Sequence, residues 1–213
     1  MPAAVLFDFD GTILDTESTS LTAWREEYFR HGLDLVDDAW LATIGTDADR
    51  YAALAELAGP GFDRERSWIR ERARETELVL ALGLREGIAE CLAEVARTGI
   101  RLAIVSSSPA DWVLGHLDRL ALRTQFDVVV TRESAARAKP HPDLYVAALG
   151  RLGVPADQAV AVEDSRHGVA AALAAGIRCV AFPNRVTRRQ DLSHAHAVAS
   201  AADLSSYLLR AAW

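Results

Sequence analysis

Two carboxylates at the end of an apolar run are the first residues in this chain that could do chemistry. Asp8 and Asp10 follow the hydrophobic segment 3–7, which is typical of a strand buried on both faces. Because residues two apart on a strand point to the same side, the two acids would project together. Gly11 permits a sharp turn at the C-terminal end of the strand, where open α/β sheets bind ligands. Burying like charges together is costly unless a cation lies between them, so the pattern indicates a cation site.

The alternative is an ordinary surface turn with both acids solvated, because Asp-Gly segments also suit turns.

A second polar group follows the apolar segment 101–105, which runs into Ser106, Ser107, Ser108 and Pro109. We expect Ser108 to be the N-cap residue of a helix and Pro109 its first residue. A helix that begins at a strand end offers free N–H groups and hydroxyls to an anion. The other interpretation is that these serines only cap the helix.

Lys139 is the only lysine among 23 basic residues, and all the others are arginines. A general bias toward arginine explains this composition without a functional reason. A single retained lysine nevertheless suggests a chemical role, because a compact ammonium is hard to replace inside a crowded carboxylate site.

The segment Asp8-Phe9-Asp10-Gly11-Thr12 resembles the first motif, DxDG(T/V), of the haloacid dehalogenase superfamily of Mg-dependent phosphohydrolases. The longer segment 7–17 resembles the β-phosphoglucomutase-like branch of that superfamily. The resemblance implies that Asp8 is the nucleophile that becomes an aspartyl-phosphate. It also implies that Asp10 is the general acid/base and gives its backbone carbonyl to the metal.

The same resemblance extends to three later segments. Ser106 matches the second motif and would bind the transferring phosphoryl group, with Ser107 beside it. Lys139 and the Pro-x-Pro-Asp segment 140–143 that follows it match the third motif. The lysine of that motif screens the nucleophile and the phosphate. Glu163 and Asp164 match the acidic pair of the fourth motif, which completes the Mg²⁺ site. Asp164 would be a direct ligand, and Glu163 either a ligand or the residue that fixes a metal-bound water.

The elements that must position these residues alternate between strands and helices. Strands are expected at 101–105, 126–131, 159–162 and 178–182, with helices at 86–98, 108–120, 142–152, 165–175 and 202–209. Residues 15–84 show no strand pattern and predict helices near 17–31, 37–44, 47–58 and 63–82. The expected fold is α/β, a Rossmann-like doubly wound parallel sheet with an inserted all-helical cap. The core would comprise residues 1–14 and 85–213, and the cap residues 15–84. Segment 84–87 lacks the proline of the family's usual Pro-Gly re-entry.

Composition restricts the partners. A formal net charge of −7 and a pI near 5.4 argue against nucleic acid or an anionic membrane as a partner. Cys91 and Cys179 form no metal-binding spacing and are interpreted as buried core residues in a reducing compartment, with a disulfide between them as the lesser alternative. The chain begins without a basic segment and has no apolar run near ~18 residues, so we expect a cytoplasmic protein, monomeric or homodimeric.

The function favoured is a Mg²⁺-dependent phosphatase for a small phosphomonoester. A sugar phosphomutase is the alternative, and a catalytically idle scaffold is a remote one that the complete set of motif residues disfavours. Mutases of the β-phosphoglucomutase type have a histidine near position 20, where this chain has Ser20. The cap has no lysine for phosphonatase chemistry, and Asp10 argues against a dehalogenase. The organic part of the substrate is not identified, and its candidate contacts are Glu17, Thr46, Arg50, Trp24, Trp68 and Arg72.

Overall fold

The computed structural model describes residues 1–44 and 48–210. Its centre is a six-stranded sheet in the order β3-β2-β1-β4-β5-β6, in which each neighbouring pair is parallel. The strands are β1 (Ala4–Phe7), β2 (Arg101–Val105), β3 (Val128–Val130), β4 (Ala159–Glu163), β5 (Arg178–Ala181) and β6 (Ala197–Val198). The doubly wound α/β fold expected from the sequence is therefore confirmed, with β6 as an additional short edge strand.

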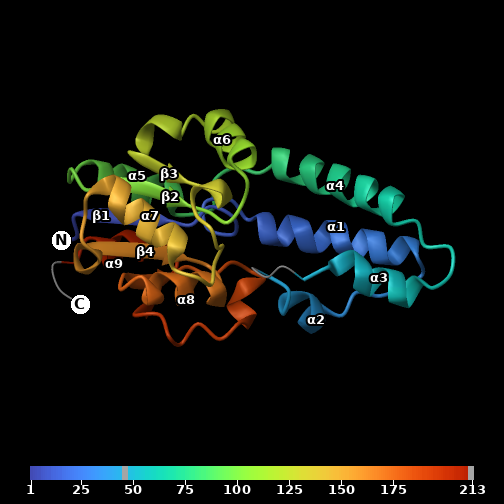
Figure 1. Ribbon diagram of the computed structural model, residues 1–213. Coiled ribbons are helices and arrows are strands. Elements are labelled where there is room, and N and C mark those ends of the chain that lie inside the picture. Colours follow the sequence, from blue (N-terminus) through green and yellow to red (C-terminus); the bar gives the residue numbers. More distant parts are fainter. Residues whose placement is uncertain (45–47, 211–213) are drawn as a thin grey trace.

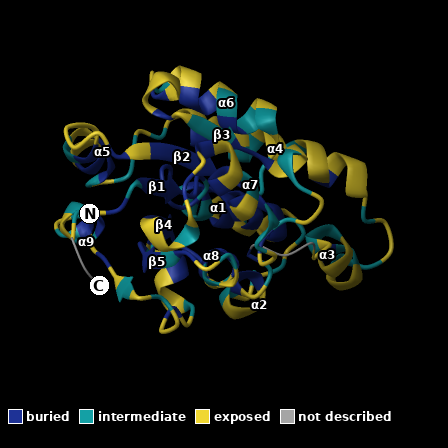
Figure 2. Cartoon of the chain, turned by 60° about the vertical axis from the view of Figure 1, so that its left-hand side comes forward, coloured by how far each residue is buried: buried dark blue, intermediate teal, exposed yellow. Residues whose placement is uncertain are grey.

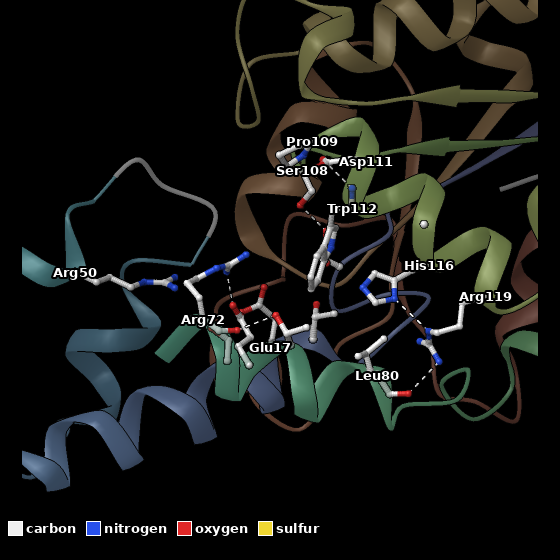
Figure 3. Close-up of a pocket in the computed structure, with 16 residues that line it drawn as sticks. Glu17, Arg50, Arg72, Leu80, Ser108, Pro109, Asp111, Trp112, His116 and Arg119 are labelled. Atoms are coloured by element: carbon white, nitrogen blue, oxygen red, sulfur yellow. Dashed lines mark hydrogen bonds and ion pairs between the residues drawn. The ribbon is translucent and has the colours of Figure 1, made fainter. Parts of the chain in front are cut away.

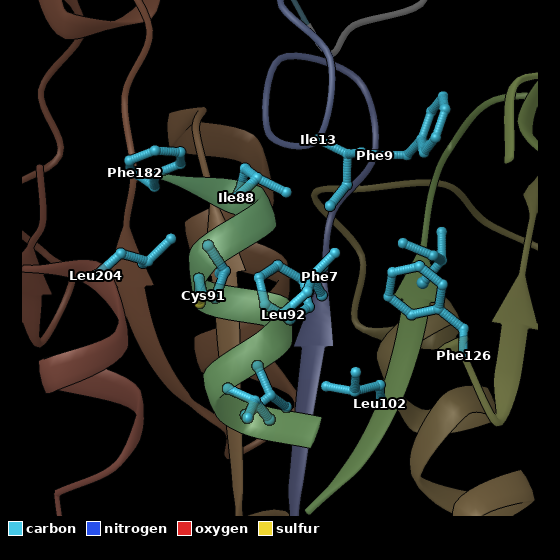
Figure 4. Close-up of a cluster of buried hydrophobic side chains, with 14 of the residues drawn as sticks. Phe7, Phe9, Ile13, Ile88, Cys91, Leu92, Leu102, Phe126, Phe182 and Leu204 are labelled. Carbon is cyan, nitrogen blue, oxygen red and sulfur yellow. The ribbon is translucent and has the colours of Figure 1, made fainter. Parts of the chain in front are cut away.

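Helices cover both faces of the sheet, and alternate strand residues point to each face. Val5 and Phe7 of β1 pack with α5 (Ile88–Ala96), α6 (Ala110–Arg119) and α9 (Leu204–Leu208). Figure 4 shows α5 lying beside β1 at Phe7. Ala4 and Leu6 pack on the other side with α7 (Asp143–Leu152) and α8 (Arg166–Ala174). Because the central strands are fully buried, their C-terminal ends are held at fixed positions. Short 3₁₀ helices lie at residues 123–125, 132–134, 156–158 and 187–189.

Four further helices extend from the sheet beyond the C-terminal end of β1 (Figure 1). They are α1 (Thr16–Arg30), α2 (Asp37–Leu41), α3 (Arg50–Ala58) and α4 (Arg64–Leu80), and α1 and α4 lie side by side. Of these, α1, α2 and α3 share a hydrophobic cluster of their own, to which the core contributes Val186. We propose on this basis that residues 15–84 are a cap domain and that residues 1–14 and 85–213 are the core.

Most helix starts agree with the sequence, and one does not. The Asp15 side chain accepts a hydrogen bond from the Ser18 N–H at the start of α1, and Ser165 caps α8 in the same way. The expectation that Ser108 caps the next helix is wrong: α6 begins at Ala110, and its N-cap residue Pro109 makes no side-chain cap bond. The Ser108 hydroxyl instead donates a hydrogen bond to the Asp10 carboxylate, at 2.6 Å. The Ser108 hydroxyl bonds to the Asp10 carboxylate and not to the start of the helix, because a carboxylate is the stronger hydrogen-bond acceptor.

The return from α4 to the core is held by Arg85 instead of a proline. Its guanidinium donates to the Gly11 carbonyl, to Phe182 O at 2.9 Å and to Pro183 O at 2.9 Å. The following Gly87 has φ +83°, and a Cβ there would lie 2.6 Å from the Ala201 carbonyl oxygen. One partly buried cation and one glycine thus fix this connection.

Two expectations from composition can be compared directly. Cys91 and Cys179 are free and buried, as expected. Within residues 1–44 and 48–210, none of the helices combines the length and the apolar character needed to cross a bilayer.

Candidate active site

The motif residues meet at the C-terminal edge of the sheet. Asp8 follows β1, and the flanking strands β2 and β4 end next to Ser106 and at Glu163, respectively. Asp164 follows directly on β4, and Lys139 lies in the loop between β3 and α7. The residues come together because β1 has both β2 and β4 as parallel neighbours, which is the usual position of a ligand site in an open sheet.

Lys139 lies at the centre of this group. Its Nζ is 2.6 Å from Asp8 Oδ1 and 2.6 Å from Glu163 Oε1, and it donates to the Val105 carbonyl at 2.8 Å. All three of the charged side chains are buried. Burial alone would lower the pKa of Lys139, but Asp8 and Glu163 outweigh it and hold this pKa above its usual value. The ammonium therefore stays charged.

The carboxylates of Asp8, Glu163 and Asp164 form a cluster that fits a metal ion. One oxygen from each lies within 4.8 Å of the others. Asp8 Oδ2 and Glu163 Oε2 are buried and have no hydrogen-bond partner within the described part of the chain. Unpartnered buried carboxylate oxygens are costly, and a hard divalent cation such as Mg²⁺ is the ion that such oxygen ligands suit. The donor set of this cluster therefore fits Mg²⁺.

The pKa values show how unbalanced the charge of this cluster is. Burial raises the pKa of Asp8 to about 8, against the lowering by Lys139, and Glu163 adds to the increase. Burial, followed by the nearby Asp8, also raises the pKa of Asp164 well above its usual value. One ammonium does not offset three buried carboxylates.

Neighbouring groups fix the orientation of the two acids at the end of β4. Tyr145 donates its hydroxyl to Glu163 Oε1 at 2.6 Å, and a Cβ on Gly168 would lie 1.8 Å from Glu163 Oε2. Asn184 donates an amide N–H to Asp164 Oδ2 at 2.8 Å. A Cβ on Gly11, which has φ +81°, would lie 2.1 Å from that same oxygen. The acids therefore need a glycine at both positions.

Asp10 is separate from the acidic cluster and faces the cavity. Its Oδ2 accepts from the Ser108 hydroxyl at 2.6 Å and from the Ser106 hydroxyl at 3.4 Å. Its Oδ1 accepts from the Trp112 indole N–H at 2.9 Å. Ser107 lies on the other side, where its hydroxyl accepts the backbone N–H of Lys139 at 3.3 Å. Ser106 thus lies beside Asp10, whereas Ser107 holds the Lys139 loop.

A cavity of about 790 Å³ lies between Asp10 and the cap helices. Figure 3 shows Arg50, Arg72 and Glu17 on its cap side and Trp112 and His116 of α6 on its core side. Burial raises the pKa of Glu17 to about 7, although Arg50 lowers it. Three of the candidate substrate contacts, Glu17, Arg50 and Arg72, thus line this cavity, and Thr46 lies outside the described residues.

Several residues at this site were not identified from the sequence. The set comprises the donors to Asp10, the partners of the acidic pair and a histidine in the cavity wall, namely Ser108, Trp112, Tyr145, Asn184 and His116. Trp112 follows Ser108 by four residues, and Ser108 itself was expected only at a helix start. Asn184 and Tyr145 lie 20 and 18 residues from their partners, so no local pattern indicated them.

Comparison with known proteins agrees with this architecture. Residues 5–182 match the model of the haloacid dehalogenase-like hydrolase family. The fructose-1-phosphate phosphatase YqaB of Escherichia coli is 36% identical over 84% of this chain and 95% of its own length. CbbY from Rhodobacter sphaeroides, solved in complex with phosphate, has a TM-score of 0.72 and 32% identity over 93% of this chain and 94% of its own.

Two further structures extend the comparison. A mutant of the same CbbY, solved with xylulose-(1,5)bisphosphate, has a TM-score of 0.71 and 31% identity over 93% of this chain and 94% of its own. β-Phosphoglucomutase from Clostridium difficile has a TM-score of 0.72 at 22% identity, over 93% and 91% of the two chains, and shares the fold. The chain therefore belongs to the haloacid dehalogenase-like hydrolase family, and the resemblance found in its sequence is confirmed.

Proposed function

We propose that this chain is a Mg²⁺-dependent phosphatase that hydrolyses a small phosphomonoester through an aspartyl-phosphate on Asp8. The observation that carries the proposal is the buried group of Asp8, Glu163 and Asp164 around Lys139, with unpartnered oxygens on Asp8 and Glu163. Relatives named as phosphatases support hydrolysis of phosphoric monoesters.

In the first step, a carboxylate oxygen of Asp8 would form a bond to phosphorus while the bond from phosphorus to the ester oxygen breaks. Asp10 would donate its proton to that leaving oxygen. In the second step, Asp10 would accept a proton from the water that attacks phosphorus and releases Asp8. Lys139 and Ser106 would stabilise the negative charge on the other phosphoryl oxygens. A bound Mg²⁺, held by Asp8, Asp164, Glu163 and the Asp10 carbonyl, would neutralise further charge there.

A small phosphorylated sugar is the substrate class that we favour. YqaB is named for fructose 1-phosphate, and CbbY has been solved with xylulose bisphosphate. The cavity over Asp10 is lined by charged and hydroxyl side chains, which suits a polar organic group. We propose that the protein acts in the cytoplasm as a monomer or homodimer, without nucleic acid or membrane as a partner.

Phosphatase is favoured over phosphomutase because of position 20. Ser20 lies on α1 and lines the cavity over Asp10, and mutases of the β-phosphoglucomutase type have a histidine near this position. Without that histidine, the phosphoryl group on Asp8 is more readily transferred to water than to a second hydroxyl of the sugar.

The proposal is tested with a panel of sugar, polyol and nucleoside phosphates in the presence of Mg²⁺. We expect inorganic phosphate without isomerised sugar phosphate, measured by a phosphate assay and by NMR. EDTA should abolish the activity and Mg²⁺ should restore it. Isomerised product in excess of phosphate would show a mutase, and activity that survives exhaustive chelation would exclude the metal site.

Two substitutions test the roles of the first-motif acids. Asp8→Asn keeps the volume but removes the nucleophile, so turnover should fall by roughly 10⁴-fold or more. Asp10→Asn should lower the rate ~10²–10⁴-fold, because a general acid/base contributes about that much. Mass spectrometry of protein quenched during turnover should find a phosphorylated Asp8 in the Asp10→Asn variant and none in Asp8→Asn.

A further inference from the structure

A second cavity, of about 530 Å³, lies among the cap helices, and we call it the inner cavity. It adjoins the cavity over Asp10, because both have Ser20, Arg50, Arg72 and Glu75 in their walls. Each volume lies in the range of about 300–1,000 Å³ that is typical of small-molecule sites. A one-ring phosphate ester bound over Asp10 would therefore leave the inner cavity free for a further part of a longer substrate.

The inner cavity combines aromatic surfaces with one buried acid. Trp24, Tyr51 and Trp68 line it, and the ring centroids of Trp24 and Tyr51 are 4.7 Å apart. The Tyr51 hydroxyl donates to Glu71 Oε2 at 2.6 Å. Aromatic side chains of this kind offer flat apolar surfaces against which the C–H face of a sugar ring can pack.

Glu71 has one oxygen that the protein leaves unpaired. The residue is only 2% exposed, and its Oε1 has no hydrogen-bond partner within the described part of the chain. A buried acceptor without a partner costs about 1–3 kcal/mol. Because Glu71 lines the inner cavity, a ligand that brings a hydrogen-bond donor to Oε1 would remove this cost.

The charges around Glu71 favour a neutral donor. Burial raises the pKa of Glu71 to about 7; the Tyr51 hydrogen bond lowers it, and Glu75 raises it further. Arg50 and Arg72 lie in the wall of the same cavity together with Asp49 and Glu75, so the charged groups around Glu71 balance in sign. A hydroxyl can donate to Oε1 without changing that balance.

We propose that the inner cavity of the cap binds a second, hydroxylated ring of the substrate, and that Glu71 Oε1 accepts a hydrogen bond from one of its hydroxyls. The inference rests on the proposed phosphatase function and narrows its substrate class to phosphomonoesters of neutral, disaccharide-sized polyols. The phosphorylated ring would lie over Asp10, and the second ring would pass Ser20 and pack against Trp24 and Trp68.

The test compares kcat/KM for neutral disaccharide phosphates with that for glucose 6-phosphate, on the same preparation and with Mg²⁺. The panel contains trehalose 6-phosphate, sucrose 6-phosphate, lactose 6-phosphate and maltose 6′-phosphate. We expect the best disaccharide ester to exceed glucose 6-phosphate by at least tenfold. A smaller ratio would overturn the proposal, and so would a preference for an amine-bearing disaccharide phosphate.

Two variants address the inner cavity itself. Glu71→Gln should lower the ratio at least fivefold, because it removes the charged acceptor while keeping the volume. Trp68→Ala should lower it about threefold, and it should fold normally because Trp68 is 51% exposed. Since the ratio compares two esters on one preparation, a loss of folded protein cancels. A ratio unchanged in both variants would overturn the assignment.

Matched controls come from the same helix. Glu65→Gln and Ile69→Ala alter exposed residues of α4 that do not line either cavity, so the ratio should stay as in the unaltered protein. Phosphate release from one-ring esters without a gain for disaccharides would contradict only this inference. Release from no ester at all would contradict the proposed phosphatase function instead.

Discussion

The edge of the sheet and the cap are built from different interactions. The acids at the sheet edge follow strands whose residues are almost all fully buried between two large hydrophobic clusters. The cluster of the cap is much smaller, and the outer faces of α3 and α4 are largely exposed (Figure 2). The sheet edge is therefore held by packing from both sides, whereas the cap has fewer buried contacts to lose when it opens.

Charged pairs replace part of the missing hydrophobic contact in the cap. Glu27 of α1 is buried and accepts from Ser67 Oγ at 2.7 Å and from Arg70 Nε at 3.2 Å, both on α4. Glu26 of α1 pairs with Arg74 of α4 at 3.0 Å. Substitutions at the sheet edge should therefore change the rate of reaction, and substitutions in these pairs should change the stability of the cap.

The largest effect among the following substitutions is expected for Lys139→Arg. The ammonium lies 2.6 Å from two carboxylates in a buried space, where a planar guanidinium is too large and is a poorer point charge. The rate kcat should fall roughly 10²–10³-fold, as for the loss of one donor to a developing negative charge. Arg137→Lys, two residues away in an exposed pair with Asp143, is the control and should stay within twofold.

The lone lysine can also be tested by chemical acylation. The exposed N-terminus should react first and without loss of activity, because Lys139 is buried and its raised pKa keeps it protonated. Activity should then fall in step with labelling of Lys139, followed by mass spectrometry. Mg²⁺ with inorganic phosphate should slow that labelling. Full activity with Lys139 fully acylated would remove this residue from the mechanism.

A smaller effect is expected for Gly168→Ala. The added Cβ would lie 1.8 Å from Glu163 Oε2 and must displace that carboxylate. We expect the Mg²⁺ concentration for half-maximal activity to rise roughly 10–100-fold, as when a group that supports a metal ligand is lost. Gly150→Ala in α7 is the control, because a Cβ there meets no atom within 4 Å. Equal Mg²⁺ dependence in both variants would show that Glu163 does not support the metal.

These tests also separate what the sequence predicted from what it did not. The sheet, the order of the elements and the acids at strand ends followed from short apolar runs that end in polar residues, because such signals are local. Ser108 was misassigned because a serine before a proline is a good helix cap, and only the fold shows that Asp10 competes for its hydroxyl. Asn184 follows β5, the strand next to β4, and Tyr145 lies on α7, so only the folded chain brings them to Asp164 and Glu163. The walls of the cavities likewise arise from packing between helices distant in sequence.

Trp112→Phe should have a more modest effect on the rate. It removes the indole N–H that donates to Asp10 Oδ1 at 2.9 Å but keeps an aromatic ring in the cavity wall. One hydrogen bond to a charged group is worth about 1.5–3 kcal/mol, and because Asp10 keeps the hydroxyls of Ser106 and Ser108 as donors we take the lower value, so kcat should fall about tenfold. Trp40→Phe is a matched control, since the buried Trp40 indole N–H has no partner within the described residues. A kcat within twofold in both variants would show that Trp112 does not position Asp10.

The smallest effect should appear in the stability of the cap, at Glu27. Burial on its own would raise the pKa of Glu27, but the hydrogen bonds from Arg70 and Ser67 outweigh it and hold this pKa below its usual value. A lowered pKa stabilises the folded cap above the pKa of the unfolded chain, near ~4.3, and this contribution is lost as the pH falls further. Acidification below that value should therefore increase hydrogen exchange in α1 and α4 before it does so in β1 and β4.

Glu27→Gln should reproduce part of this change at neutral pH. We expect the cap amides to lose about 1–2 kcal/mol of protection, because the hydrogen bonds remain possible but the ion pair does not. Glu26→Gln, at the more exposed pair, should cost less than half of that. If α1 and α4 exchanged in step with β1 and β4 in every variant, the cap and the sheet would unfold as one unit, and the proposed difference between the two regions would be wrong.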